Sequence, residues 1–234
     1  MGNKRKAVGG KHRAGARRPS PPAHRRFVAL LSGGLDSVVA LAAAARAARP
    51  ALCLTFDYGQ PAAGREIQAA RRVAGHYLAR HQVIALPWYR ELLPESFAGC
   101  GQRVPEPEVF GAESAEAVWV PGRNLVFIAI AAAWAEHLGC GEVVTGFNAE
   151  EAATFPDNSA GFVRAATAAL GFSSLRKVRL TAPLAGLDKR GIVRLGRSLG
   201  APVELAWSCY RGGASPCGRC ESCQRRAAAM AGAT

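Results

Sequence analysis

The stretch Ser32-Gly33-Gly34-Leu35-Asp36-Ser37 separates a short apolar run, residues 27–31, from an alanine-rich run that begins at Val38. Two glycines there permit a tight turn with uncovered backbone N–H groups, and a following helix would direct its positive end at the same point. Such a junction suits a phosphate group. It is neither a Walker loop nor a dinucleotide fingerprint, because the Gly-Lys-Ser/Thr ending and the third glycine are missing. We therefore expect an α/β protein with a phosphate site after its first strand.

Apolar runs and helix-forming runs alternate along the rest of the chain, which predicts a doubly wound parallel sheet with helices on both faces. The expected strands are 27–31, 51–56, 81–86, 142–147 and 178–183, and the expected helices are 38–49, 62–80, 124–138, 159–170 and 187–199. Residues 87–122 and 148–158 are expected to be irregular loops. Asp188 and Gly200 are expected to cap the last helix.

Charge is distributed unevenly over the 234 residues, of which 49% are hydrophobic and sufficient for one sizeable core. Residues 1–26 hold nine of the 30 Lys and Arg residues and no acid, which leaves 21 basic against 17 acidic residues elsewhere. We expect a disordered leader, serving either as a solubilising tail or as a contact for nucleic acid. The domain plan is then a leader at 1–26, an α/β domain at 27–205 and a small segment at 206–234 packed on it.

Four cysteines near the C-terminus follow the spacing Cys209-x7-Cys217-x2-Cys220-x2-Cys223. Two overlapping C-x2-C steps allow thiolates to surround one ion, and Cys209 can complete a tetrahedron. This spacing predicts a closed structural Zn²⁺ site that holds the C-terminal segment against the domain. A chain without a secretory apolar stretch or a span of about 20 apolar residues is expected to act in the cytoplasm, away from membranes.

Further motifs occur in a definite order along the chain. They are FDYGQ at 56–60, VPGRN at 120–124, TGFN at 145–148, FPD at 155–157, Pro-Leu at 183–184, Asp-Lys at 188–189 and the cysteine-containing stretch 208–223. Together with SGGLDS they resemble the 7-cyano-7-deazaguanine synthase family, within the pyrophosphatase-loop ATPases, over residues 27 to about 226. The resemblance implies the Rossmann-like, adenine-nucleotide alpha-hydrolase-like form of the sheet and a homodimer.

The resemblance also implies a reaction. ATP would adenylate the carboxylate of 7-carboxy-7-deazaguanine, ammonia would displace AMP, and a second activation of the amide would give the nitrile. Adenylation turns an unreactive carboxylate oxygen into part of a leaving group, and the protein contributes orientation and charge stabilisation.

Each motif residue receives an expected role from this resemblance. Ser32, Asp36, Arg123 and Lys189 are expected to be catalytic. The expected ATP-binding residues are Leu30, Leu31, Ser32, Gly33, Gly34, Leu35, Asp36, Ser37, Val38, Asp57, Gln60, Arg123 and Asn124. Tyr58, Asn148, Phe155 and Asp157 are expected to contact the deazapurine. Asp36 would either hold Mg²⁺ or shape the turn, Asn124 either contacts nucleotide or only caps a helix, and Lys189 either reaches phosphates or faces solvent.

The chain departs from the family pattern where substrate should be recognised. Pro61-Ala62 replace Arg-His, residues 155–159 read Phe-Pro-Asp-Asn-Ser instead of Tyr-Pro-Asp-Cys-Arg, and residues 149–154 differ from Asp-Tyr/Phe-Ser-Gly. Two alternatives therefore stay open. One is a ligase that joins a similar carboxylate to another amine on a protein or tRNA, and the other is a non-catalytic nucleotide and zinc module that binds nucleic acid through its leader.

Overall fold

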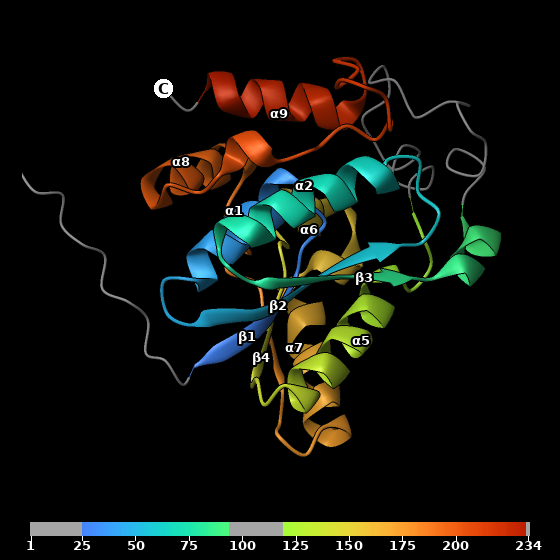
Figure 1. The fold of residues 1–234 in the computed structure, drawn as a ribbon, viewed down its shortest axis with the longest axis vertical. Helices are drawn as coiled ribbons and strands as arrows, with labels where there is room; N and C mark the ends of the chain where they lie inside the picture. The colour runs from blue at the N-terminus through green and yellow to red at the C-terminus, as the bar shows by residue number, and fades with distance from the viewer. Residues whose placement is uncertain (1–24, 94–118, 233–234) are drawn as a thin grey trace, which may run out of the picture.

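The computed structural model describes residues 25–93 and 119–232. Its centre is a five-stranded parallel sheet with the strand order β3-β2-β1-β4-β5 (Figure 1). The strands are β1 (Arg26–Leu30), β2 (Arg49–Asp57), β3 (Arg80–Ala85), β4 (Glu142–Val144) and β5 (Arg179–Thr181). The helices are α1 (Leu35–Ala44), α2 (Ala63–His76), α5 (Arg123–His137), α6 (Ala149–Thr154), α7 (Ala160–Ser173), α8 (Lys189–Leu199) and α9 (Glu221–Ala231), with short 3-10 turns η1 (Pro87–Leu92), η2 (Pro156–Asn158) and η3 (Val203–Leu205). The expected α/β class with a parallel sheet is confirmed.

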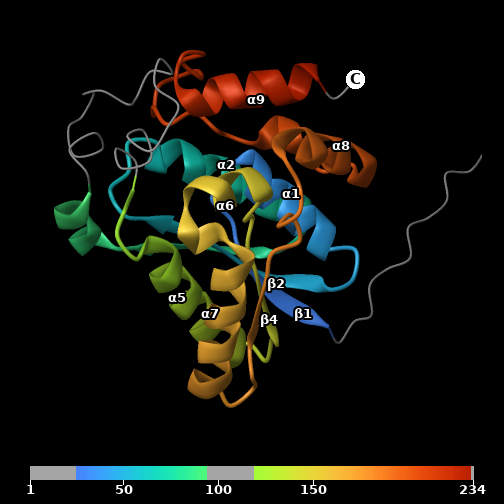
Figure 2. The ribbon, with the colours of Figure 1, turned by 180° about the vertical axis from the view of Figure 1, so that it is seen from behind.

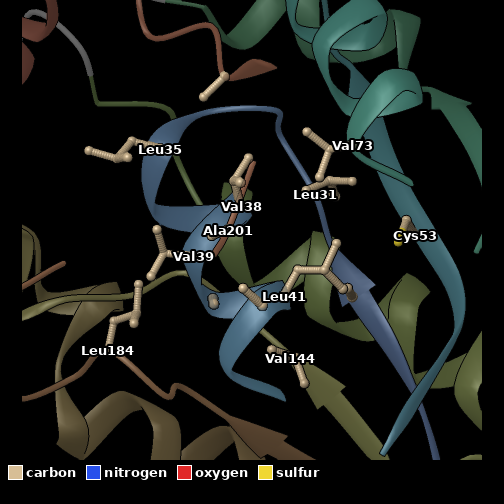
Figure 3. Packing of buried hydrophobic residues seen from close by; sticks show 14 of the residues in the cluster. Leu31, Leu35, Val38, Val39, Leu41, Cys53, Val73, Val144, Leu184 and Ala201 are labelled. Carbon is tan, nitrogen blue, oxygen red and sulfur yellow. The ribbon is translucent and has the colours of Figure 1, made fainter. Parts of the chain in front are cut away.

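Helices cover both faces of the sheet. Helices α1, α2 and α8 lie over one face with α9 beyond α8, and α5 and α7 cover the other (Figures 1 and 2). Alternation along β1 supplies both cores, because Phe27 and Ala29 belong to one buried cluster and Val28 to the other. Figure 3 shows side chains of α1, among them Val38 and Leu41, within the first of these clusters.

The expected strands are confirmed, with shifted bounds. The fourth strand ends at Val144 rather than 147, although Thr145 N–H still donates to the Thr181 carbonyl at 2.9 Å. The chain then turns at Gly146, where a Cβ would lie 2.9 Å from the Ser37 nitrogen. Strand β4 therefore ends early, because the backbone after it packs closely against the start of α1.

Helix boundaries follow local capping. Helix α1 begins at Leu35 rather than 38, because Gly34 is extended and serves as its N-cap. The expected caps of α8 are confirmed, since Asp188 Oδ1 accepts from Gly191 N–H at 2.6 Å and Gly200 is left-handed at φ 61°.

The loop expected at 148–158 is wrong, because this segment forms α6 and η2. Asn148 caps α6 by accepting from Glu151 N–H at 3.0 Å. Alanine and glutamate favour helix, and Glu150 and Glu151 in the first turn complement its positive end. The polar composition of this segment concealed a short helix with good capping chemistry.

The expected leader, except residues 25 and 26, and most of the expected irregular segment 87–122 lie outside the described residues. Over the described ranges, no helix is both long and apolar enough to cross a membrane.

The chain moves outward from β1 to β3 in one direction and from β4 to β5 in the other, so β1 and β4 flank the point where the strand order reverses. In open parallel sheets, ligands bind at the carboxyl ends of the strands beside this point.

Candidate active site

A cavity of about 930 Å³ opens at the carboxyl ends of β1, β2 and β4. It is lined by residues from the first strand-helix junction, from the turn after β2, from the start of α5, from α6 and η2, and from the C-terminal segment. Among the residues expected from the sequence, its lining includes Leu30, Leu31, Ser32, Gly34, Leu35, Asp36, Ser37, Tyr58, Gln60, Arg123, Asn124, Phe155, Asp157 and Lys189. The structure therefore brings most of the motif residues to one place.

The strand-helix junction has the geometry of an anion site. Gly33 is left-handed at φ 81°, and a Cβ there would lie 2.7 Å from the Glu66 carbonyl oxygen, so only glycine fits. The first helical bond of α1 runs from Val38 N–H to Gly34 carbonyl at 3.1 Å. The N–H groups of residues 35–37 precede that bond, as the first N–H groups of a helix do, and can bind an anion.

Two hydroxyl groups shape this junction. Ser32 Oγ lies 3.2 Å from Ser37 Oγ and accepts from Gly34 N–H at 3.3 Å. Ser37 Oγ donates to the Gly34 carbonyl at 2.9 Å. Both serines line the cavity, so they can also meet a ligand there.

Lys189 joins the junction to α6. Its ammonium group is bound to Asp36 Oδ2 and lies 2.8 Å from Glu151 Oε1, and its backbone N–H donates to Glu150 Oε1 at 2.8 Å. Burial raises the pKa of Asp36 to about 6, and Lys189 opposes that rise. Burial acts to raise the pKa of Glu151 as well, but Lys189 and hydrogen bonds hold that pKa below its usual value. Lys189 is thus not a solvated surface residue.

One carboxylate oxygen of Asp36, Oδ1, is available to a ligand. Its Oδ1 atom is buried and has no hydrogen-bond partner among the described residues. Carboxylate oxygens are the ligands that hard divalent cations prefer. A cation beside the junction would satisfy this oxygen and offset the excess of two carboxylates over one ammonium.

Another part of the cavity wall combines a cation with flat aromatic rings. Arg123 Nη1 donates to Tyr58 Oη at 3.1 Å, and the guanidinium lies 5.6 Å from the centre of the Tyr58 ring. Trp119 and Phe155 stack with their centroids 6.1 Å apart. Asp157 accepts from Asn158 Nδ2 at 3.0 Å; burial raises its pKa, against the influence of Arg123. This wall can hold a flat heterocycle that carries a negative group.

The turn after β2 is held by Gln60. Its Oε1 accepts from Tyr58 N–H at 3.0 Å, while its Nε2 donates to the Phe56 carbonyl and to Glu66 Oε2 at 2.8 Å. Asp57 Oδ1 accepts from Gly59 N–H at 3.1 Å. The side chain of Gln60 therefore positions Tyr58 and also lines the cavity.

Four expected residues do not line the cavity: Gly33, Val38, Asp57 and Asn148. Val38 is core, and Asn148 is fully buried under α6 as its cap. Asn124 lies within the first turn of α5, whose N-cap is the left-handed Gly122. The alternative in which Asn124 only caps this helix is therefore wrong.

Several lining residues carried no sequence signal of their own. Glu151 sat in a segment expected to be a loop, and Glu66 looks like any acidic residue in an exposed helix. The C-terminal segment adds a group of polar and aromatic side chains, namely Trp207, Ser208, Tyr210, Glu221, Ser222, Arg225 and Arg226. Only the folded arrangement brings these residues to the cavity.

The four C-terminal cysteines converge. Their sulfur atoms all lie within 4.8 Å of one another and could hold a metal ion. Cys209 Sγ accepts from the backbone N–H groups of Arg211 and Cys217 at 3.3 and 3.4 Å, and Cys217 Sγ accepts from Cys220 N–H at 3.3 Å. Backbone N–H groups directed at sulfur favour the thiolate form that a metal needs.

The sequence of the chain matches a known protein family over most of its length. The model of the family described as "Queuosine biosynthesis protein QueC" matches residues 26–234. The chain belongs to the QueC family. This membership confirms the family indicated by the ordered motifs.

Two curated relatives of this QueC-family chain carry the same name. A "7-cyano-7-deazaguanine synthase" of Pelotomaculum thermopropionicum is 51% identical over 216 residues, which cover 88% of this chain and 98% of the relative. The protein of that name from Methanosarcina mazei is 43% identical over 215 residues, covering 88% and 93%.

Two solved structures are more distant from the QueC-family chain. "NMN synthetase from Francisella tularensis" has a TM-score of 0.44 at 18% identity, covering 79% of this chain and 65% of its own. "A 4-thiouridine synthetase - RNA complex with bound ATP" has a TM-score of 0.46 at 20% identity, covering 90% and 53%. This chain thus spans less than two thirds of either solved protein.

Proposed function

We propose that the chain converts 7-carboxy-7-deazaguanine and ammonia into 7-cyano-7-deazaguanine at the expense of ATP. The family membership and the shared name of its relatives support this activity. The single observation that carries the proposal is the cavity itself, which is lined both by the start of α1, whose N–H groups suit an anion, and by a cation and flat rings that suit a flat acid. A small-molecule synthase is the coarser statement, and the deazapurine acid and ammonia are its proposed substrates.

The first half of the reaction is adenylation. A carboxylate oxygen attacks the α-phosphorus of ATP, the bond to the bridging oxygen breaks, and pyrophosphate leaves. The N–H groups of residues 35–37, Ser32 and Lys189 are positioned to stabilise negative charge on the leaving group. Arg123, beside Tyr58, orients the substrate carboxylate, while Trp119 and Phe155, stacked on each other, offer the substrate ring a flat apolar surface.

The second half makes and then dehydrates an amide. Ammonia attacks the acyl carbon, AMP leaves, and one proton is released. The amide oxygen then attacks the α-phosphorus of a second ATP with release of pyrophosphate, and loss of AMP with two N–H protons leaves the nitrile. Because both activations form the same kind of bond, one nucleotide site and one acid site are enough for both.

Two metals complete the proposal. Mg²⁺ would be held by Asp36, whose Oδ1 has no hydrogen-bond partner in the part of the chain that the structure describes, and would supply positive charge to the phosphates. Zn²⁺ would be held by Cys209, Cys217, Cys220 and Cys223, where four thiolates suit a closed structural site. The homodimer, the cytoplasmic location and the role of the leader stay predictions.

Mass spectrometry of the products tests the proposal. The chain is incubated with 7-carboxy-7-deazaguanine, ATP and ammonium, and the expected products are the nitrile, AMP and pyrophosphate. AMP release without formation of the nitrile would favour the ligase alternative, which needs a different amine. If ATP is not split between its α- and β-phosphorus with this acid, the proposed function is wrong.

A further inference from the structure

Trp207 lies between the nucleotide junction and the cysteine cluster. Its backbone N–H donates to the Gly33 carbonyl at 2.9 Å, and its indole Nε1–H donates to the Cys209 carbonyl at 2.8 Å. The Arg65 guanidinium lies 5.4 Å from the centre of the Trp207 ring. Trp207 lines the large cavity and also a second one of about 550 Å³ beside the cysteines. One residue therefore contacts both candidate sites.

The bond to Gly33 sets the direction of a peptide group. In a planar trans peptide, the carbonyl of residue 33 and the N–H of residue 34 point in opposite directions. With the Gly33 carbonyl held by Trp207, the Gly34 N–H is turned the other way, where it meets Ser32 Oγ at the cavity wall. A shift of residue 207 would rotate this peptide and the N–H groups that follow it.

The cysteine cluster in turn holds Trp207. The indole is anchored to the carbonyl of a cluster residue, and Trp207 and Tyr210 pack against buried Cys209 and Cys220. A path of direct contacts thus runs from the four sulfur atoms through Trp207 to Gly33. Each step of this path is a hydrogen bond or a packed contact rather than mere proximity.

We propose that Trp207 is a positioning residue that couples metal occupancy of the cysteine cluster to nucleotide affinity at the junction. The inference rests on the proposed function only in that ATP binds at residues 32–37. It adds that the metal does more than hold the C-terminal segment, because it keeps the Gly33–Gly34 peptide in its binding orientation.

Trp207→Phe tests the indole anchor while keeping the backbone N–H and most of the ring. With the metal-loaded protein, the Kd for Mg²⁺-saturated α,β-methylene-ATP is expected to rise about threefold to tenfold, the effect of one lost hydrogen bond. Trp134→Phe is the matched control, since that indole also lies under an arginine, Arg80, but on the opposite face of the sheet. It is expected to leave the Kd unchanged.

A linkage measurement tests the coupling without any mutation. By reciprocity, the nucleotide analogue must tighten Zn²⁺ binding by the same factor by which Zn²⁺ tightens nucleotide binding. We expect this mutual factor in the wild type, measured by competition with a chromophoric chelator, and a smaller factor in Trp207→Phe.

The outcomes separate the two proposals. A wild type that binds no nucleotide contradicts the proposed function. A wild type that binds nucleotide with equal affinity with and without Zn²⁺, while it stays folded, overturns this inference alone. So does a Trp207→Phe protein with unchanged Kd and an unchanged mutual factor.

Discussion

At the scale of single residues, we expect the charge group formed by Asp36, Lys189 and Glu151 to govern how turnover depends on pH. Asp36 must be ionised to pair with Lys189 or to hold a cation, and burial raises its pKa to about 6, against the pull of Lys189. The protonated form therefore predominates below that pH. We expect kcat/KM for ATP to fall as the pH drops through about 6, measured as a pH-rate profile of AMP release.

Glu151→Gln tests the same group from its other side. The negative charge of Glu151 contributes to raising the pKa of Asp36, so its removal should move the acidic limb of the profile to lower pH. Lys189 also loses the negative charge of the partner that lies 2.8 Å from its ammonium, and kcat should fall by about tenfold to hundredfold because the ammonium is less well positioned.

Glu150→Gln is the adjacent control, because its carbonyl-type oxygen can still accept from Lys189 N–H and its side chain does not line the cavity. Glu150→Gln should leave the acidic limb of the pH-rate profile at the same pH as in the wild type. An identical profile for both variants would show that Glu151 does not act through Asp36.

Residue motifs predicted Asp36 and Lys189 but not Glu151. The first two belong to short patterns with a recognisable chemical purpose. Glu151 is one of two successive glutamates in a polar stretch, and nothing local distinguishes it from Glu150. Its importance depends on α6 forming and turning one of the two carboxylates toward Lys189, which is a property of tertiary structure.

At the scale of elements, the turn between β1 and α1 depends on Gly33. A Cβ at φ 81° is strained, and it would also lie 2.7 Å from the Glu66 carbonyl and 2.9 Å from the Ala70 nitrogen of α2. Gly33→Ala should therefore lower the free energy of unfolding by about 2–4 kcal/mol, read from urea denaturation. Nucleotide affinity should fall with it because the junction must shift away from α2.

Gly171→Ala is the opposite case on α7. A Cβ there meets nothing within 4 Å, and alanine favours helix over glycine. This variant should be more stable by up to about 1 kcal/mol. Equal losses at positions 33 and 171 would mean that the close approach of α2 to the junction is not what requires glycine.

Element prediction succeeded where a pattern ran over many residues. Buried runs such as 51–56 and the long apolar stretch of α5 identified themselves as a strand and a helix. It failed over 148–158, where six helical residues are too few to show a period and the decisive signal was the cap at Asn148. Strand β4 ended early for a different reason, the tertiary contact of Gly146 with α1.

At the scale of the whole molecule, the cavity is lined by segments that are far apart in the sequence. Residues 30–37 and 207–226 contribute to one lining, and Arg225 of α9 pairs with Glu221 at 2.6 Å and with Glu150 of α6 at 3.9 Å. The sequence predicted that the cysteine cluster, as a metal site, holds the C-terminal segment against the domain. It did not predict that this segment would form a wall of the cavity, because that depends on α9 packing on α8 and on Arg225 of α9 reaching Glu150 of α6.

Cys220→Ser should therefore affect more than the metal. Cys220 is fully buried and its Sγ lies 4.0 Å from Cys209 Sγ, so a serine would remove one of four ligands from the centre of the cluster. We expect bound Zn²⁺ to be lost and the melting temperature to drop, because metal binding contributes directly to the folding of so small a segment. Cys140→Ser, at another buried cysteine far from the cluster in sequence, should destabilise the core while metal content stays complete. If Cys220→Ser loses its metal yet keeps the melting temperature and nucleotide affinity of the wild type, the C-terminal segment is held by its contacts with α8 and α6, and the cluster supports neither the fold nor the cavity.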